Sequence, residues 1–238
     1  MYMKSLFFST FLFLVFSSHA VTNSVVIDGD VDAVGDWDDE ICLPDLEGQN
    51  DVMGQSDANN ACIASNFASV QPANTIYLRF DFDETGLNGG NTADGCWLLD
   101  NDTDGNANLA LCFSLGGNPF TLDSADVKGY TCNDANADKC SGPTEITPFV
   151  ATCLLDVTAT NVFDNTDDDA SVECSVPIST LGLTAGDQVS LTYGCTFNSA
   201  IPNSNPVDCV NDSGNPFNVD TGTGGNSTPV ELMFFKVE

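Results

Sequence analysis

A period-two alternation of apolar and polar residues, repeated in short segments, constrains the fold of this chain most strongly. Within residues 76–83, Ile76, Leu78, Phe80 and Phe82 alternate with residues that would point to the opposite face of a strand. No segment shows the 3.6-residue period of an amphipathic helix. The pattern predicts an all-β protein, specifically an antiparallel β-sandwich. Comparable runs occur at 24–28, 96–99, 109–113, 149–157, 171–178, 188–195 and 230–237.

The segments between these runs are rich in Gly, Asn, Asp and Pro, which is typical of turns. There is no internal repeat and no clear linker. Residues 211–229 are rich in Gly, Ser, Thr and Asn, and we expect a long surface loop that returns a last strand, 230–237, to the sheet. The expected organisation is a single β-sandwich domain over residues 21–238.

Residues 1–20 have the features of a secretory signal peptide. Lys4 provides the positive start, residues 6–16 the apolar segment, and residues 18–20 (Ser-His-Ala) the small residues near a cleavage site. The apolar segment is too short to span a bilayer, and no second long apolar run follows. We therefore expect a secreted protein, extracellular or at the cell surface, with no membrane span.

Acidic residues far outnumber basic ones, with 35 Asp and Glu against 5 Lys and Arg and a formal charge of −30. Loss of Lys4 with the signal peptide leaves 4 − 35 = −31. A surface this negative argues against nucleic acid and anionic membranes as partners. The only histidine, His19, lies within the signal peptide, so the mature chain is expected to lack both Ser-His-Asp catalysis and histidine-ligated metal.

All ten cysteines follow the signal peptide, and an even number in a secreted chain predicts five disulfides. Sequence alone does not fix their pairing. Metal ligation is the competing interpretation, but the chain has no C-x-x-C motif. We predict that neighbours pair: Cys42–Cys62, Cys96–Cys112, Cys132–Cys140, Cys153–Cys174 and Cys195–Cys209.

An aspartate-dense loop over residues 100–108 is the strongest candidate binding site. Closely spaced carboxylates repel one another unless a cation lies among them, and their oxygens suit calcium. An EF-hand would need a glutamate at its twelfth position, where this chain has Leu111 within an expected strand. We therefore predict a calcium loop that joins two strands and is completed by a ligand from elsewhere. Its predicted ligands are Asp100, Asp102, Asp104, Asn106 and Asn108.

Three weaker acidic clusters accompany this loop. A second metal site is predicted at Asp28, Asp30 and Asp36. The cluster of Asp134, Asn136 and Asp138 has ligand spacing without a glycine, so a turn is favoured. The acids at 164–169 are expected to form a solvated loop.

Two further functions compete with a purely structural one. A glycoside hydrolase needs only two carboxylates, but among 35 acids some pair reaches the required distance by chance, so no catalytic residue is assigned. Trp37 and Trp97, with several tyrosines, would suit an aromatic platform for a sugar, although core or edge packing is favoured for each.

Several stretches resemble known families. Residues 26–30 with residues 35–37 (Gly-Asp-Trp) resemble the opening of family 9 carbohydrate-binding and DOMON-like modules. Residues 172–183 resemble a late strand and turn of such sandwiches. Residues 83–86 with 91–96, and residues 100–112, 130–140 and 202–209, resemble bacterial secreted, cysteine-rich surface domains of uncharacterised role. The resemblance implies a calcium-bearing, jelly-roll-like sandwich on an exported protein.

The favoured function is a secreted, non-enzymatic, calcium-stabilised β-sandwich with a structural or adhesive role. Its expected partners are extracellular matrix or cell-surface components, glycans among them. A carbohydrate-binding module is the first alternative. A histidine-free glycoside hydrolase that uses an acidic pair is the second.

Overall fold

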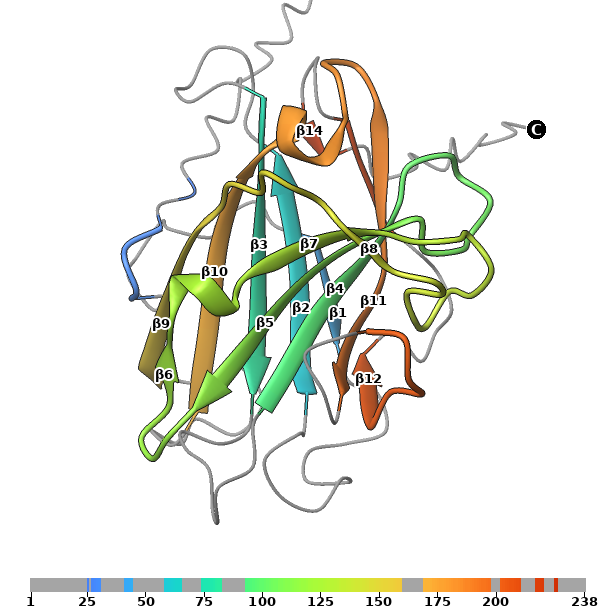
Figure 1. The fold of residues 1–238 in the computed structure, drawn as a ribbon. Helices are drawn as coiled ribbons and strands as arrows, with labels where there is room; N and C mark the ends of the chain where they lie inside the picture. Colours follow the sequence, from blue (N-terminus) through green and yellow to red (C-terminus); the bar gives the residue numbers. More distant parts are fainter. Residues whose placement is uncertain are drawn as a thin grey trace, which may run out of the picture.

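The chain forms two antiparallel β-sheets that pack face to face (Figure 1). The computed structural model describes residues 25, 27–30, 41–44, 58–65, 74–82, 93–159, 169–197, 202–210, 217–220 and 225–226. Sheet A has five strands, in the order β1 (Ile41–Pro44), β2 (Ala58–Ser65), β3 (Thr75–Phe82), β10 (Asp169–Pro177) and β9 (Thr152–Ala159).

Sheet B has nine strands, and its backbone path runs β14-β13-β11-β4-β5-β7-β8. Two further strands pair at its sides, β12 with β11 and β6 with β5. The strands are β4 (Ala93–Asp100), β5 (Leu109–Gly116), β6 (Thr121–Leu122), β7 (Lys128–Thr131), β8 (Thr144–Glu145), β11 (Gln188–Phe197), β12 (Asp208–Val210), β13 (Phe217–Asp220) and β14 (Gly225–Asn226).

Short 3₁₀ turns are the only helical elements among the residues described: η1 (Ser124–Asp126) and η2 (Ile178–Leu181). Within this part of the chain, no helix has the length and apolar character needed to cross a membrane. The predicted signal peptide lies outside the described residues.

The predicted antiparallel β-sandwich is confirmed, and most of the predicted strands are present. The short strands β1, β6, β7, β8 and β12 were not predicted, and three further segments differ. Val25 and Ile27 are not in a strand, and they pack instead on Tyr77. β2 was not predicted because its Asn and Ala residues hide the alternation, although it lies between β1 and β3 in sheet A. The expected loop 211–229 contains β13, which pairs with β11. Residues 230–237 lie outside the described part.

The core lies between the sheets and is rich in aromatic residues. Phe80 and Phe82 of sheet A meet Trp97 and Phe113 of sheet B, all essentially inaccessible to solvent. The Phe80 ring packs edge-on against Trp97 and Phe113, with centroids 5.9 and 5.6 Å away. The Trp97 indole N–H donates to the Arg79 carbonyl oxygen at 2.8 Å, which ties the two sheets together within the apolar layer.

The outer face of sheet A buries charged side chains. Arg79 Nε lies 2.8 Å from Asp81 Oδ1, and the Ser171 hydroxyl donates to the same carboxylate. Glu173, directly opposite Arg79 in the β3–β10 register, is fully buried and accepts a hydrogen bond from the Gly29 amide at 2.9 Å. Buried ions are tolerated because they are paired and hydrogen-bonded.

Four of the predicted disulfides are confirmed: Cys96–Cys112, Cys132–Cys140, Cys153–Cys174 and Cys195–Cys209. Cys62 is also disulfide-bonded, and Cys42 lies directly opposite it in the β1–β2 register. The side chain of Cys42 lies outside the described part, so the fifth pair stays a prediction.

Candidate metal centre

The loop between β4 and β5 is organised around the carboxylate of Asp100. Asp100 ends a fully buried strand and is itself 1% exposed. Its Oδ1 accepts hydrogen bonds from the amides of Asp102 and Thr103, at 2.8 and 2.7 Å, and its Oδ2 from the amide of Gly105 at 2.8 Å. These three N–H donors fix the position of the Asp100 carboxylate within the loop.

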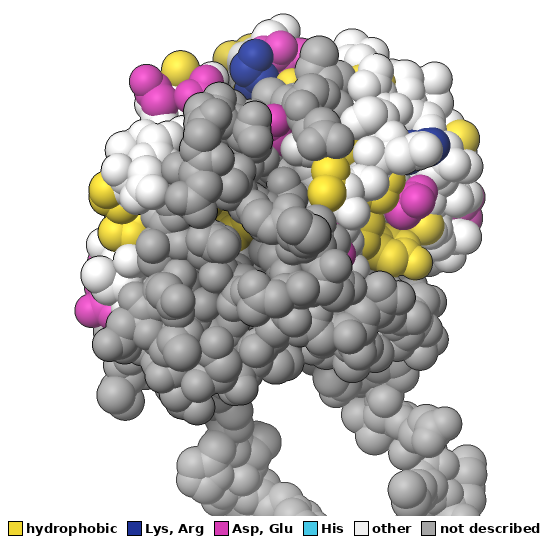
Figure 2. Space-filling view, turned by 90° about the horizontal axis from the view of Figure 1, so that it is seen from below, with side chains coloured by type: hydrophobic (Ala, Val, Ile, Leu, Met, Phe, Trp, Pro, Cys, Tyr) yellow, Lys and Arg dark blue, Asp and Glu magenta, His cyan; other side chains and the backbone are white. Residues whose placement is uncertain are grey.

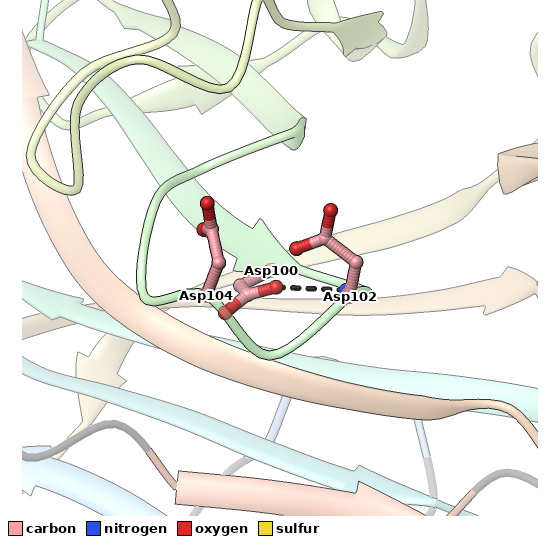
Figure 3. A group of neighbouring side chains, drawn as sticks. All are labelled: Asp100, Asp102 and Asp104. Atoms are coloured by element: carbon pink, nitrogen blue, oxygen red, sulfur yellow. Dashed lines mark hydrogen bonds between the residues drawn. The ribbon is translucent and has the colours of Figure 1, made fainter.

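Asp102 and Asp104 extend from this loop beside Asp100 (Figure 3). One carboxylate oxygen of each of the three aspartates lies within 4.8 Å of the others. Asp102 and Asp104 are exposed, and Asn106 donates to Asp104 from its amide and its side chain, at 2.8 and 3.1 Å. The predicted clustering of these acids is therefore present, with one buried and two exposed carboxylates.

A second loop, between β7 and β8, lies against the first (Figure 1). The Ala107 amide donates to the Asn136 carbonyl oxygen at 2.8 Å, and the Cys132 amide donates to the Asn108 carbonyl oxygen at 2.9 Å. Because of these contacts, the Asp134 carboxylate lies within the electrostatic field of the three aspartates. Asp134 Oδ1 is shielded from solvent and has no hydrogen-bond partner.

The proximity of these acids changes how two of them titrate. Desolvation first, and then the negative charges of Asp102, Asp104 and Asp100, raise the pKa of Asp134 above its ordinary value. Desolvation also raises the pKa of Asp102, and the charges of Asp104 and Asp100 add to the shift. Like charges disfavour ionisation, so a proton or a cation would reduce the repulsion within the cluster.

The donor set fits a hard cation. It consists of the carboxylate oxygens of Asp100, Asp102 and Asp104, without thiolate or imidazole. Such oxygens suit calcium, which accepts irregular arrangements of six to eight ligands. Asp134 comes from outside the loop and is close enough to feel the charge of these three aspartates, although it is not one of the group whose oxygens lie within 4.8 Å of one another. Sequence reasoning assigned its cluster to a turn, although the Cys132–Cys140 bracket and the ligand spacing were signals that it held an ordered acidic loop.

The other predicted ligands of this site have defined positions. Asn106 contacts Asp104, as described above. The Asn108 side-chain oxygen accepts a hydrogen bond from the Asn101 amide at 3.0 Å, so it closes the base of the loop. Leu111, at the position of an EF-hand's glutamate, lies in β5 as predicted and is fully buried in the core.

At the predicted second metal site, the Asp28 side chain accepts a hydrogen bond from the Asp30 amide at 3.0 Å, and both residues are exposed. Asp36 lies outside the described residues. Within the described ranges, the only group of three or more potential ligand side chains is Asp100, Asp102 and Asp104. The second site stays a prediction.

The aromatic residues considered for sugar stacking are largely buried. Trp97 is in the core, and Tyr77 and Tyr130 are each 5% exposed. These three side chains therefore present no open stacking surface. Trp37 lies outside the described part of the chain.

Stability in the absence of calcium should depend on pH through Asp134. Because its pKa is higher in the folded than in the unfolded chain, the folded state binds more protons in the window above the ordinary value of 3.8, and stability falls as pH rises through that window. Asp134→Asn should therefore stabilise calcium-free protein at pH 7, and this gain should vanish below about pH 4. Urea unfolding of both calcium-free proteins from pH 4 to 7 measures the difference in their free energy of unfolding. A difference that does not change with pH would contradict the expectation.

Comparisons with known proteins returned no match: no family model, no curated protein and no solved structure is similar to this chain.

Proposed function

We propose that this protein is an extracellular, non-catalytic structural or adhesive domain whose β4–β5 and β7–β8 loops are locked together by calcium. One observation carries the proposal: the shielded, unpartnered Oδ1 of Asp134 is brought by a separate loop to the cluster of Asp100, Asp102 and Asp104. Four carboxylates from two loops would repel each other without a cation, and extracellular calcium is abundant enough to fill weak sites.

The surrounding structure supports a stabilising role rather than a sensing one. Each loop is closed by a disulfide, Cys96–Cys112 around the first and Cys132–Cys140 around the second. Backbone hydrogen bonds already join the loops. A cation bound here would strengthen a contact that already exists between the loops. It would not trigger a movement, because disulfides and strands fix both loops.

The acidic surface argues against polyanionic partners. The disulfides support a location outside the cell. On the face shown in Figure 2, acidic side chains are scattered over the described surface and basic ones are few. Disulfides persist in oxidising, extracellular environments. Partners of this domain are accordingly expected among neutral or basic extracellular components, including proteins and uncharged glycans.

Calcium should raise the thermal stability of the purified protein. If the dissociation constant is on the order of 10⁻⁴ M, 10 mM calcium should add roughly 2.7 kcal/mol. In a domain of this size, that corresponds to an increase of about 5–10 °C in Tm. Differential scanning calorimetry with calcium and with chelator measures the shift, and isothermal titration calorimetry measures binding directly.

Asp134→Asn should remove most of this gain while stabilising the calcium-free protein, since it deletes both a ligand and a repelling charge. Asp126→Asn is the matched control: Asp126 is exposed, lies in η1 and is outside the cluster. The proposal is wrong if calcium leaves the Tm of the wild type unchanged, or if Asp134→Asn and Asp126→Asn respond alike.

A further inference from the structure

Four cysteines lie side by side across four neighbouring strands of sheet B. Cys209 of β12 is directly opposite Cys195 of β11, Cys195 is opposite Cys96 of β4, and Cys96 is opposite Cys112 of β5. We call Cys209, Cys195, Cys96 and Cys112 the cysteine row. Its two outer pairs form disulfides, and its central pair, Cys195 and Cys96, does not.

The cysteine row lies on the outer face of sheet B, away from the main core. The adjacent residues Gly194 and Trp97 face the core, where a Cβ on Gly194 would meet Ala61 and Phe80. Successive residues of a strand point to opposite faces, so the cysteines point outward. They form a separate apolar cluster there, partly covered by the β7–β8 loop, where the Thr192 hydroxyl donates to the Ala137 carbonyl oxygen at 3.1 Å.

The central pair is spaced for a disulfide. In the two existing bonds the Cα atoms are 4.1 Å apart, as expected for antiparallel partners that do not exchange backbone hydrogen bonds. In an antiparallel sheet, a residue forms a non-hydrogen-bonded pair with one neighbouring strand and a hydrogen-bonded pair with the other. Cys195 and Cys96 therefore form the other kind of pair, with Cα atoms about 5.5 Å apart, which falls within the usual range for disulfides.

We propose that the cysteine row is a thiol–disulfide exchange site that accepts an external thiol at Cys209 and passes the exchange inward. Cys209 is the half-buried member, whereas Cys195, Cys96 and Cys112 are at most 2% exposed. A small thiol, or the thiol of a protein oxidoreductase, would therefore reach the Cys209 sulfur first.

The chemistry balances without any further reactant. The external thiolate bonds to Cys209 Sγ, and Cys195 leaves as a thiolate. Cys195 then attacks Cys96 Sγ, forms the Cys195–Cys96 disulfide and releases the Cys112 thiolate, which takes up the proton given up by the external thiol. Two disulfides and one thiol are present before and after. The attacking, central and leaving sulfurs of this second step belong to the adjacent strands β11, β4 and β5, at directly opposite positions.

The exchange would move the crosslinks within sheet B. The bonds that join β11 to β12 and β4 to β5 would be replaced by one that joins β11 to β4, and Cys209 would carry the external thiol. The expected partner is therefore a thiol compound that becomes covalently attached at the edge strand β12. This inference does not depend on calcium binding.

Sheet A provides an internal control. Cys174 is bonded to Cys153 on one side, and its other neighbour across the β3–β10 register is Leu78. A thiol freed at Cys174 has no adjacent disulfide in its sheet to attack. Cys153→Ser and Cys209→Ser thus each free one buried cysteine, in surroundings that differ in the presence of a neighbouring disulfide.

The test is mass-spectrometric mapping of the full secreted chain after alkylation of free thiols and non-reducing digestion. In Cys209→Ser we expect two signals: a Cys96–Cys195 crosslink, and a free thiol at Cys112 that accounts for roughly a tenth or more of the total free thiol. The Cys96–Cys112 and Cys96–Cys195 bonds compete on similar terms, because they differ only in the strand that they join to β4. In Cys153→Ser the free thiol should stay at Cys174. A free thiol confined to Cys195, or equal scrambling in both variants, would overturn the proposal.

The wild type gives a second measurement that does not require the variants to fold. After brief incubation with glutathione, we expect the mixed disulfide at Cys209 together with the Cys96–Cys195 crosslink. Glutathione attachment at Cys132 or Cys153 without that crosslink would overturn the proposal.

Discussion

Trp97→Ala is expected to lower the free energy of unfolding by about 3–5 kcal/mol, among the largest effects of any single substitution. The indole is completely buried, contacts Phe80 and Phe113, and donates its N–H to the Arg79 carbonyl oxygen. Alanine would leave a cavity between the sheets and an acceptor without its donor. Urea denaturation monitored by circular dichroism measures the loss.

Val150→Ala is the control for this substitution, because Val150 is 57% exposed and should change stability by less than about 0.5 kcal/mol. Similar losses in the two variants would show that Trp97 does not pack in the core as described.

Arg79→Met is expected to destabilise the protein by about 3–5 kcal/mol, because it removes the cation from a buried acidic face. Arg79 pairs with Asp81 at 2.8 Å, with both side chains about one-tenth exposed or less, and the neighbouring Glu173 is fully buried. Methionine keeps much of the side-chain volume, so the loss would reflect the uncompensated carboxylates. Denaturant unfolding at pH 7 is the measurement.

Lys128→Met provides the matched comparison. Lys128 lies 3.8 Å from Glu145, and both side chains are more than two-fifths exposed, so this pair should contribute about 0–1 kcal/mol. Adding Asp81→Asn to Arg79→Met should recover part of the lost stability, since it removes a buried charge. If Arg79→Met costs no more than Lys128→Met, the pair does not stabilise the fold.

The strand pattern and the disulfides were predictable from the sequence because both depend on local information. Alternation marks which face of a strand is buried, and turn residues mark where it ends. Each confirmed disulfide joins neighbouring segments of the chain, with sequence separations from 8 to 21 residues, so pairing neighbouring cysteines was correct. β2 is not visible in the sequence pattern because its burial comes from its place between β1 and β3 rather than from its residues.

The three clustered aspartates of the candidate metal centre were also visible in the sequence. The spacing of Asp100, Asp102 and Asp104 within one hairpin loop brings them together without help from the rest of the fold. Asp134 could not be assigned to them, since its loop reaches the site only after β7 pairs with β5 and the backbone bonds at Ala107 and Cys132 form. Contacts between loops depend on strand order, which local patterns do not encode.

The sequence by itself therefore determined the class of fold, the positions of six of its seven long strands and a dense acidic loop, and pairing cysteines with their neighbours gave the four confirmed crosslinks. Only the tertiary structure decided that a second loop brings Asp134 close to these acids and that β11 pairs with β4, which places Cys195 next to Cys96 from about a hundred residues away. Alternation and turn chemistry act over a few residues, whereas strand order is decided by which distant surfaces bury one another.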